Sequence, residues 1–411
     1  MAGLYIHIPF CRSRCIYCAF YSTTSLDLRQ RYVDAVCREM VSRGGTAIDT
    51  VYLGGGTPSQ LTIAQLEQLF LYINKVYSLS PHAEVTIEAN PDDVTAAFAA
   101  TVSQLGINRV SMGAQTFDDS RLRFLRRRHT SAQVAEAVGR LRRAGIRNIS
   151  IDLMYGFPGE SLDEWQHDIA CALDLGVEHI SAYCLTIEDD TPLQRMNVSP
   201  ADEETERQMY YTLIDRLTQA GYEHYEISNF ALKKASPAGD GLKKKPPLRG
   251  EVWRDGVERK PPLRGEVWRD GVERKPPLRG EVWRGLHNSG YWTDQPYIGI
   301  GAAAHSYDRQ RRQWNVSDIN AYIKGIESGT PDFGFEILDD ATRYNDRVML
   351  ALRTCEGLDL GTLTDADRQY LLPLAHKHIG AGLLRLDGSR LILTRKGLFV
   401  SDLVISDLML V

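Results

Sequence analysis

Short apolar runs alternate with stretches of helical periodicity along residues 4–220. The apolar runs predict six strands, at 4–9, 50–55, 84–90, 109–115, 149–156 and 179–185. The periodic stretches predict helices near 28–43, 63–72, 92–105, 118–126, 131–144, 161–174 and 202–220. Strict alternation of strand and helix indicates parallel strands joined by right-handed crossovers, which is the pattern of an α/β protein.

Polar and glycine residues gather at the carboxyl ends of the predicted strands: Gly54–Gly56, Glu88–Asn90, Gln115, Asp152 and Gly156. Parallel sheets and barrels place their chemistry at this edge. Six strand–helix units suit a partial (β/α)6 barrel of the TIM type. A flat, doubly wound sheet is the alternative, and periodicity does not separate the two.

Residues 245–285 are built from copies of one 15-residue unit. The unit KPPLRGEVWRDGVER fills 245–259 and again 260–274, and a truncated third copy fills 275–285. Two prolines and two glycines in each unit oppose both helix and central strand. We therefore expect an extended or disordered excursion from a surface loop. Binding of a partner or nucleic acid is the weaker alternative, because the net charge of each unit is only +1.

The C-terminal region, 335–411, reads as helices followed by a hairpin at 383–394 with Asp-Gly between its strands. This order resembles a mostly helical, winged-helix-like domain that packs on the barrel or covers it. The predicted organisation is a core (1–232), the repeat insert (233–285), a segment that completes the barrel (286–334) and the C-terminal domain (335–411).

Composition indicates a globular protein of more than one domain. The 411 residues are 43% hydrophobic and 25% charged. The net charge of −5 offers no general attraction for nucleic acid. The N-terminus lacks the pattern of a signal peptide, and no apolar stretch approaches the roughly 20 residues that span a bilayer. We therefore expect a cytoplasmic protein without a nucleic-acid partner.

Three of the seven cysteines, Cys11, Cys15 and Cys18, follow the first strand with the spacing C-x3-C-x2-C. Structural zinc requires four protein ligands, and His7 is the nearest candidate for the fourth. A structural iron–sulfur cluster usually has four cysteines as well. The remaining possibility is a [4Fe–4S] cluster whose fourth iron stays open for a small molecule.

This cysteine loop, with Tyr17 before its last cysteine, resembles that of the radical S-adenosylmethionine (SAM) superfamily. The resemblance implies a [4Fe–4S] cluster on Cys11, Cys15 and Cys18, with SAM chelated at the open iron. It implies competence to bind SAM and leaves turnover of SAM open. The SAM-binding residues that the motifs imply are Tyr5, Gly54, Gly55, Gly56, Thr57, Glu88, Gln115, Arg127 and Asp152.

The chemistry of these residues suits the parts of SAM. Asp152 or Gln115 can bind the ribose hydroxyls, and Arg127 can pair with the carboxylate. Glu88 can face the ammonium group or hold Arg127 in place. Because three arginines are adjacent at 126–128, the sequence leaves open which of them points inward.

Further motifs resemble the group that contains oxygen-independent coproporphyrinogen III oxidase and heme chaperones. They are LYIHIPFC, GGGTPS, NRVSMGAQTF, DLMYGFPGES and YEISNFA. The oxidase has one more cysteine two residues after the third, where this chain has Phe20. HNSGYW, at 287–292, also matches the chaperone branch. The resemblance implies a chaperone that delivers heme to acceptor proteins, membrane-bound ones among them, with an electron donor such as flavodoxin or ferredoxin.

Two histidines are candidates for contact with heme. His287 begins the HNSGYW motif, and a neutral imidazole is a good axial ligand for heme iron. A hydrogen-bonded structural histidine is the alternative. His305 follows the small residues GIGAAA and is a second candidate. The rival function is that of an enzyme, the oxidative decarboxylation of coproporphyrinogen III to protoporphyrinogen IX.

Overall fold

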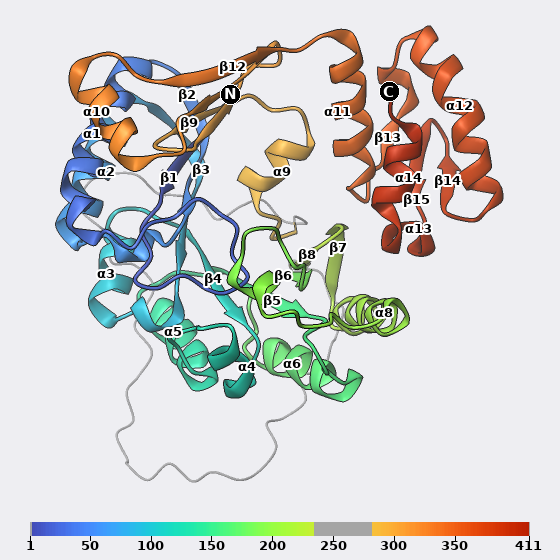
Figure 1. Cartoon of the computed structure of the whole chain (residues 1–411), viewed down its shortest axis with the longest axis horizontal. Coiled ribbons are helices and arrows are strands. Elements are labelled where there is room, and N and C mark those ends of the chain that lie inside the picture. Colours follow the sequence, from blue (N-terminus) through green and yellow to red (C-terminus); the bar gives the residue numbers. More distant parts are fainter. Residues whose placement is uncertain (1, 234–281, 411) are drawn as a thin grey trace, which may run out of the picture.

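The predicted alternation of strands and helices is present in the computed structural model, which describes residues 2–233 and 282–410 (Figure 1). The first six strands are β1 (Ala2–Ile8), β2 (Ala47–Gly55), β3 (Ser78–Ala89), β4 (Arg109–Gln115), β5 (Asn148–Tyr155) and β6 (His179–Cys184). The first eight α-helices are α1 (Arg29–Arg43), α2 (Ile63–Val76), α3 (Ala96–Gln104), α4 (Asp119–Phe124), α5 (Ser131–Arg143), α6 (Leu162–Asp174), α7 (Pro192–Arg195) and α8 (Glu203–Gln219).

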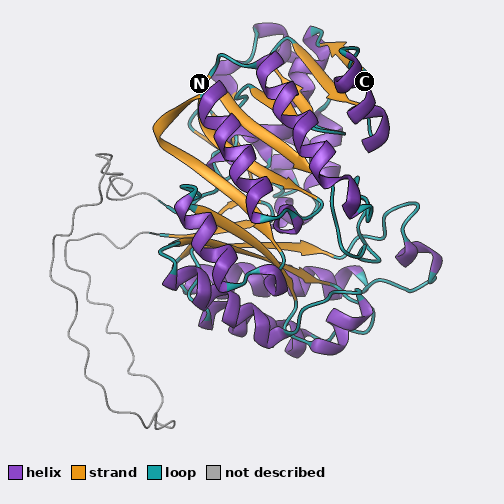
Figure 2. Ribbon diagram, turned by 90° about the vertical axis from the view of Figure 1, so that its left-hand side faces the viewer, coloured by secondary structure: helices purple, strands orange, loops and turns teal. Residues whose placement is uncertain are grey.

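Strand order decides between the two predicted architectures. Strands β1 to β6 lie side by side in their order along the chain, and each neighbouring pair is parallel. A doubly wound sheet reverses its order at a switch point, whereas right-handed crossovers that all run one way place the helices on one face. Figure 2 shows helices on the outer side of the curved sheet. The predicted partial barrel is therefore confirmed.

Local sequence explains why the helices form where they do. In α2, the Thr62 side chain and Gln65 make a reciprocal capping box at the N-terminus. Four apolar side chains with the spacing i, i+3, i+4, i+7 are buried on one face of this helix: Leu66, Leu69, Phe70 and Ile73. The same kind of capping box begins α5 and α6.

Side chains alternate across the barrel wall. Along β1, Leu4, Ile6 and Ile8 are fully buried in the hydrophobic core that includes residues of α1 and α2. The intervening Tyr5 and His7 point the other way, because successive strand side chains face opposite sides of a sheet. Tyr5 contacts the ring of Tyr52 on β2. Along β1 the side chains that face the barrel interior are therefore polar or aromatic rather than aliphatic.

An antiparallel hairpin of β7 (Tyr222–Glu226) and β8 (Asn229–Leu232) extends the sheet beyond β6. The predicted excursion of the repeat insert falls mainly on residues 234–281, which lie outside the described residues. The two flanks of that segment meet, because Lys233 pairs with Val282 in an antiparallel bridge. The Trp283 N–H also donates to the Leu232 carbonyl at 3.1 Å. Motifs on either side of the insert are therefore held together in space.

At the other edge, β9 (Tyr297–Ile300) pairs in parallel with β1. The sheet continues antiparallel through β10 (His305–Tyr307), β11 (Arg311–Asn315) and β12 (Phe333–Ile337). Helix α9 (Leu286–Trp292) contacts β2, and α10 (Ile319–Ser328) packs on α1. The segment predicted to complete the barrel thus lies along its β1 edge, and the predicted boundary between 334 and 335 falls inside β12.

The C-terminal domain has a hydrophobic core of its own around Tyr344, Leu371 and Val404. Its elements are α11 (Asp340–Leu352), β13 (Leu358–Asp359), α12 (Asp365–Gly380), β14 (Leu384–Asp387), β15 (Arg390–Leu393), α13 (Arg395–Phe399) and α14 (Ser401–Leu408). The predicted hairpin is formed by β14 and β15, with Gly388 in the left-handed region of its turn. None of the helices in the described part of the chain combines the length and apolar character needed to cross a bilayer.

Candidate functional site

The three clustered cysteines lie on the loop that leaves β1, all of them half-buried free thiols. The Cys11 Sγ lies 3.5 Å from the Thr57 hydroxyl, and Arg127 Nη1 lies 3.6 Å from the Cys15 Sγ. Burial raises the pKa of Cys11 and of Cys18. The charge of Arg14 offsets part of this effect at both thiols, and cationic neighbours favour the thiolate form that binds metal.

The cysteine geometry fits a cluster better than a single metal ion. Among the described residues, no three His, Cys, Asp or Glu side chains gather closely enough to hold one ion. Both ring nitrogens of His7, the candidate fourth zinc ligand, are engaged, by the Tyr5 hydroxyl at 2.9 Å and the Tyr21 carbonyl at 3.1 Å. In a [4Fe–4S] cubane each thiolate binds a different iron, so the three thiols lie further apart than the ligands of one ion.

The glycine motif at the end of β2 brings the chain close to the cysteine loop. Gly55 has φ of +113°, and a Cβ there would lie 2.5 Å from the His7 ring. At Gly56 a Cβ would lie 2.7 Å from the carbonyl carbon of Pro9. Only glycine fits these approaches. Tight packing of β2 on β1 thus accounts for part of the motif, and it also places Thr57 beside Cys11.

Glu88, near the end of β3, holds the glycine loop. Its carboxylate accepts a hydrogen bond from the Tyr52 hydroxyl at 2.7 Å and from the Gly55 N–H at 3.1 Å. Burial raises the pKa of Glu88 to about 7. Of the two predicted roles, support of Arg127 is not seen, since no hydrogen bond joins Glu88 to Arg127 among the described contacts.

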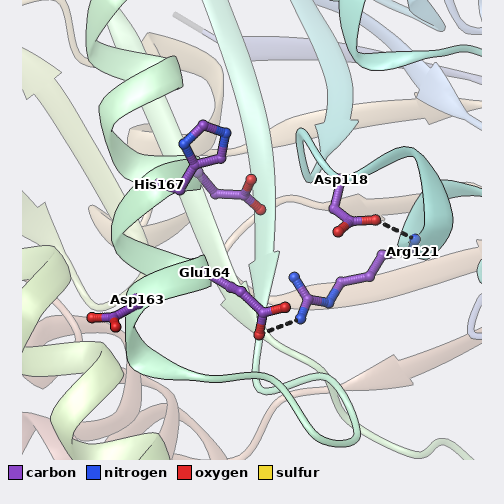
Figure 3. A pocket seen from close by; sticks show the side chains of 6 residues that line it. Asp118, Arg121, Asp163, Glu164 and His167 are labelled. Carbon is purple, nitrogen blue, oxygen red and sulfur yellow. Dashed lines mark hydrogen bonds and ion pairs between the residues drawn. The ribbon is translucent and has the colours of Figure 1, made fainter.

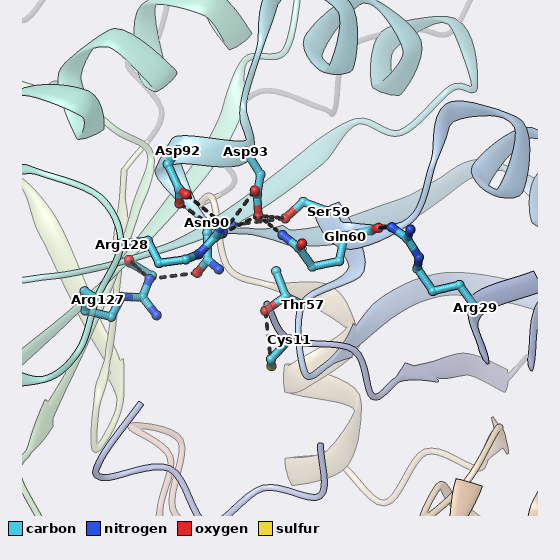
Figure 4. A network of polar contacts seen from close by, with 11 residues as sticks. Cys11, Arg29, Thr57, Ser59, Gln60, Asn90, Asp92, Asp93, Arg127 and Arg128 are labelled. Atoms are coloured by element: carbon cyan, nitrogen blue, oxygen red, sulfur yellow. Dashed lines mark hydrogen bonds and ion pairs between the residues drawn. The ribbon is translucent and has the colours of Figure 1, made fainter. Parts of the chain in front are cut away.

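Arg127 is the arginine that points inward (Figure 4). Its Nη2 donates to Asn90 Oδ1 at 2.8 Å and to the Gly113 carbonyl at 2.5 Å. Arg128 instead pairs with Asp92 and Asp93 at 3.0 Å. The side chain of Arg126 is exposed. The ambiguity among the three arginines is thereby resolved.

Gln115 on β4 and Asp152 on β5 are the remaining predicted SAM-binding residues at this edge of the sheet. Gln115 is buried and has φ of 68°, a left-handed conformation that is rare outside glycine and here coincides with a bulge after Gly113. Asp152 on β5 lies opposite Gly113 in the register. Burial raises the pKa of Asp152, and a hydrogen bond from Ser181 and the charge of Arg109 offset part of this effect. Predicted SAM residues from β2 to β5 therefore share one edge with the cysteine loop.

His287 and Tyr5 belong to a different place, inside the barrel. His287 is 4% exposed and has partners at both ring nitrogens, the Thr50 hydroxyl at Nδ1 (2.8 Å) and the Tyr291 hydroxyl at Nε2 (2.9 Å). Burial and then the charge of Arg109 lower the pKa of His287 to about 3, which keeps the ring neutral. The role of His287 as a heme ligand stays a prediction, and binding of iron would require one of its two ring hydrogen bonds to open.

The other candidate, His305, lies on β10 with an exposed side chain. Its ring stacks on Trp314, with ring centroids 6.0 Å apart. Among the described residues, no hydrogen bond or ring contact joins His305 to His287 or to the cysteine loop.

Three residues that support the site were not predicted from the sequence: Thr50, Tyr52 and Glu84. Asn90 was predicted only as part of the polar strand end at 88–90, without a role of its own. Thr50 and Tyr52 read as ordinary strand residues. Only the fold reveals that Glu84 accepts the N–H groups of Leu286 and His287, both at 3.0 Å.

A cavity of about 250 Å³ lies elsewhere, between α4 and α6 (Figure 3). Its lining residues are Asp118, Arg121, Asp163, Glu164, His167 and Asp168. Arg121 pairs with Glu164 across it at 2.9 Å. None of the predicted site residues is in this lining, so the cavity is separate from the candidate site.

Comparison with known proteins agrees with this geometry. Residues 5–172 match the radical SAM superfamily, and residues 338–400 match the HemN C-terminal domain. The solved structure of Escherichia coli coproporphyrinogen III oxidase (HemN), described as a radical SAM enzyme, matches with a TM-score of 0.78 at 20% identity. That match covers 99% of this chain and 90% of the other, and at this identity it shows the fold.

The fold and the site thus define a radical SAM protein with a HemN-type C-terminal domain, and membership of this class implies a [4Fe–4S] cluster and SAM as cofactors. Heme chaperone HemW of Mycobacterium tuberculosis is 31% identical over 99% of this chain and 94% of its own length. Heme chaperone HemW of Bacillus subtilis is 32% identical over 87% of this chain and 85% of its own. The chain belongs to the HemW family.

Proposed function

We propose that this chain binds heme and delivers it to acceptor proteins. The observation that carries the proposal is similarity over nearly the full length to a protein named heme chaperone HemW. Phe20 supports it, since the further cysteine of the oxidase branch is replaced here by a side chain that is 72% exposed. The acceptors include membrane-bound proteins, the compartment is the cytoplasm, and an electron donor such as flavodoxin or ferredoxin serves the cluster.

The residues at the barrel edge have separate roles in this proposal. Cys11, Cys15 and Cys18 hold the [4Fe–4S] cluster, and together with SAM it supplies one-electron chemistry when bound. Arg127 binds the SAM carboxylate through charge-assisted hydrogen bonds. Glu88 faces the ammonium group across the glycine loop.

Titration of anaerobically reconstituted protein with heme tests the proposal. We expect a His-ligated Soret spectrum at one heme per chain, and weaker binding in His287→Ala. His305→Ala is the matched control and should bind heme as the wild type does. Absence of stoichiometric heme binding by the wild type would contradict the function itself, whereas loss in His305→Ala alone would move the ligand to β10.

Coproporphyrinogen oxidation is the second candidate, and the structural match to HemN is the observation in its favour. An anaerobic assay with reductant, SAM and coproporphyrinogen III separates the two. Formation of vinyl product over many turnovers would favour the enzyme over the chaperone.

A further inference from the structure

The two hydrogen bonds of the His287 ring are not equivalent. Thr50, at Nδ1, is a buried residue of β2 in the middle of the parallel sheet. Tyr291, at Nε2, lies one turn further along α9 itself and is only half-buried. Rotation of one side chain opens the second bond. The first bond joins α9 to the sheet, where Glu84 also accepts the first N–H groups of the helix.

Chemistry assigns a direction to these two bonds. A phenol is a better hydrogen-bond donor than an aliphatic hydroxyl, so Tyr291 donates its O–H to Nε2. A neutral ring carries one proton, which then lies on Nδ1 and is donated to Thr50 Oγ1. A hydrogen bond at one ring nitrogen fixes which nitrogen is free to bind a metal.

We propose that the Tyr291 hydroxyl occupies, at Nε2 of His287, the position that heme iron takes when heme binds, while Thr50 fixes the tautomer. This inference rests on the proposed heme-binding function. Heme binding is then a ligand exchange, in which the O–H···Nε2 bond breaks and the Fe–Nε2 bond forms. The imidazole neither gains nor loses a proton, and Thr50 keeps its bond. Tyr291 is accordingly a positioning residue that sets access to the ligand.

Heme titration of Tyr291→Phe tests this directly. Removal of the competing hydroxyl leaves Nε2 unpaired in the free protein, so heme should bind about three- to tenfold more tightly with the wild-type Soret spectrum. Thr50→Val should bind more weakly than the wild type, because the tautomer is no longer fixed. Tyr297→Phe is the matched control, since Tyr297 packs edge-on against Tyr291 with centroids 4.7 Å apart. It should change heme affinity by less than about twofold.

If folded Tyr291→Phe binds heme only as tightly as the wild type, or more weakly, the inference is wrong. The proposed function still stands in that case, as long as the wild type binds heme. Failure of the wild type to bind heme would overturn both. A measurement without any variant is ¹⁵N NMR of histidine-labelled wild type. It should show the His287 proton on Nδ1, and the opposite tautomer would also overturn the inference.

Discussion

The barrel has two polar regions, and they differ in how fully their polar side chains are hydrogen-bonded within the protein. At the strand-end edge, which we call the mouth, the cysteine thiols and Arg127 are half-buried, and Asp152 is held by partners that only partly offset its burial. In the interior, His287 has a partner at each ring nitrogen. His179 is similar, with Ser150 and Tyr225 each at 2.8 Å. The mouth therefore keeps half-buried thiols and Arg127 within reach of a ligand, whereas both ring nitrogens of the interior histidines are paired within the protein.

The difference shows that a motif residue can have all its hydrogen bonds made before any ligand arrives. His287 and Cys15 both stand in motifs, yet His287 is buried with both ring nitrogens hydrogen-bonded, whereas Cys15 is a half-buried thiol beside Arg127. Buried polar groups with full partners rigidify a core, and the loss of one partner is costly. Mutations in the two regions should therefore fail in opposite ways.

The largest expected effect is that mutations in the two regions damage different properties, cluster binding at the mouth and folding stability in the interior. Cys15→Ala should lose the cluster completely while its melting temperature stays close to that of the wild type. His287→Ala should retain the cluster and lose about 2–4 kcal/mol of stability, because it creates a cavity and leaves Thr50 and Tyr291 unpaired. Iron and sulfide content after anaerobic reconstitution, together with urea denaturation, measures both.

Cys355→Ser serves as the control for the cysteine, since Cys355 is an exposed free thiol of the C-terminal domain. A His287→Ala protein as stable as the wild type would contradict the comparison, because the hydrogen bonds of the interior would then contribute no more to stability than those of the mouth.

The second effect separates two adjacent arginines at the mouth. Arg127→Lys should weaken SAM binding about 10- to 100-fold, since lysine cannot reproduce the guanidinium contacts and a charge-assisted hydrogen bond contributes about 1.5–3 kcal/mol. Arg128→Lys changes the same chemistry one residue away, on the ion pairs with Asp92 and Asp93, and should change SAM affinity less than about threefold. Isothermal titration with SAM measures both, and equal losses would show that the inward direction of Arg127 does not matter.

The smallest effect concerns pH. Burial raises the pKa of Glu88 to about 7, with Asp152 raising it further and Tyr52, Gly55 and Arg109 lowering it. Its neutral form is therefore favoured in the folded protein, and Glu88 stabilises the fold below about pH 4.5 and loses this contribution as pH rises through about 7. An ammonium group needs the carboxylate, so SAM affinity should rise severalfold between pH 6 and 8, in the opposite sense to stability.

Glu88→Gln removes the titrating group at nearly constant shape. SAM affinity in this variant should be lower at pH 8 and nearly independent of pH. A wild-type affinity that stays flat from pH 6 to 8 would count against contact between Glu88 and the ammonium group.

Local patterns were sufficient for much of this protein. The cysteine loop lies within eight residues, and its spacing together with Tyr17 carries the family resemblance that implied the cluster. The barrel strands and helices follow from short-range periodicity and capping, and the predicted 109–115 strand matches β4 residue for residue. Such features depend on neighbours in the chain, so the sequence by itself determined them.

Tertiary structure decided what depends on distant partners. Thr50 and His287 are 237 positions apart, and no local pattern reveals that they share a hydrogen bond. The inward direction of Arg127 depends on Asn90 and Gly113, which belong to other strand ends. The order of strands, which separated a barrel from a flat sheet, depends on pairing across the whole core. Periodicity indicates which face of a helix or strand is buried, and only the folded chain determines which residues that face contacts.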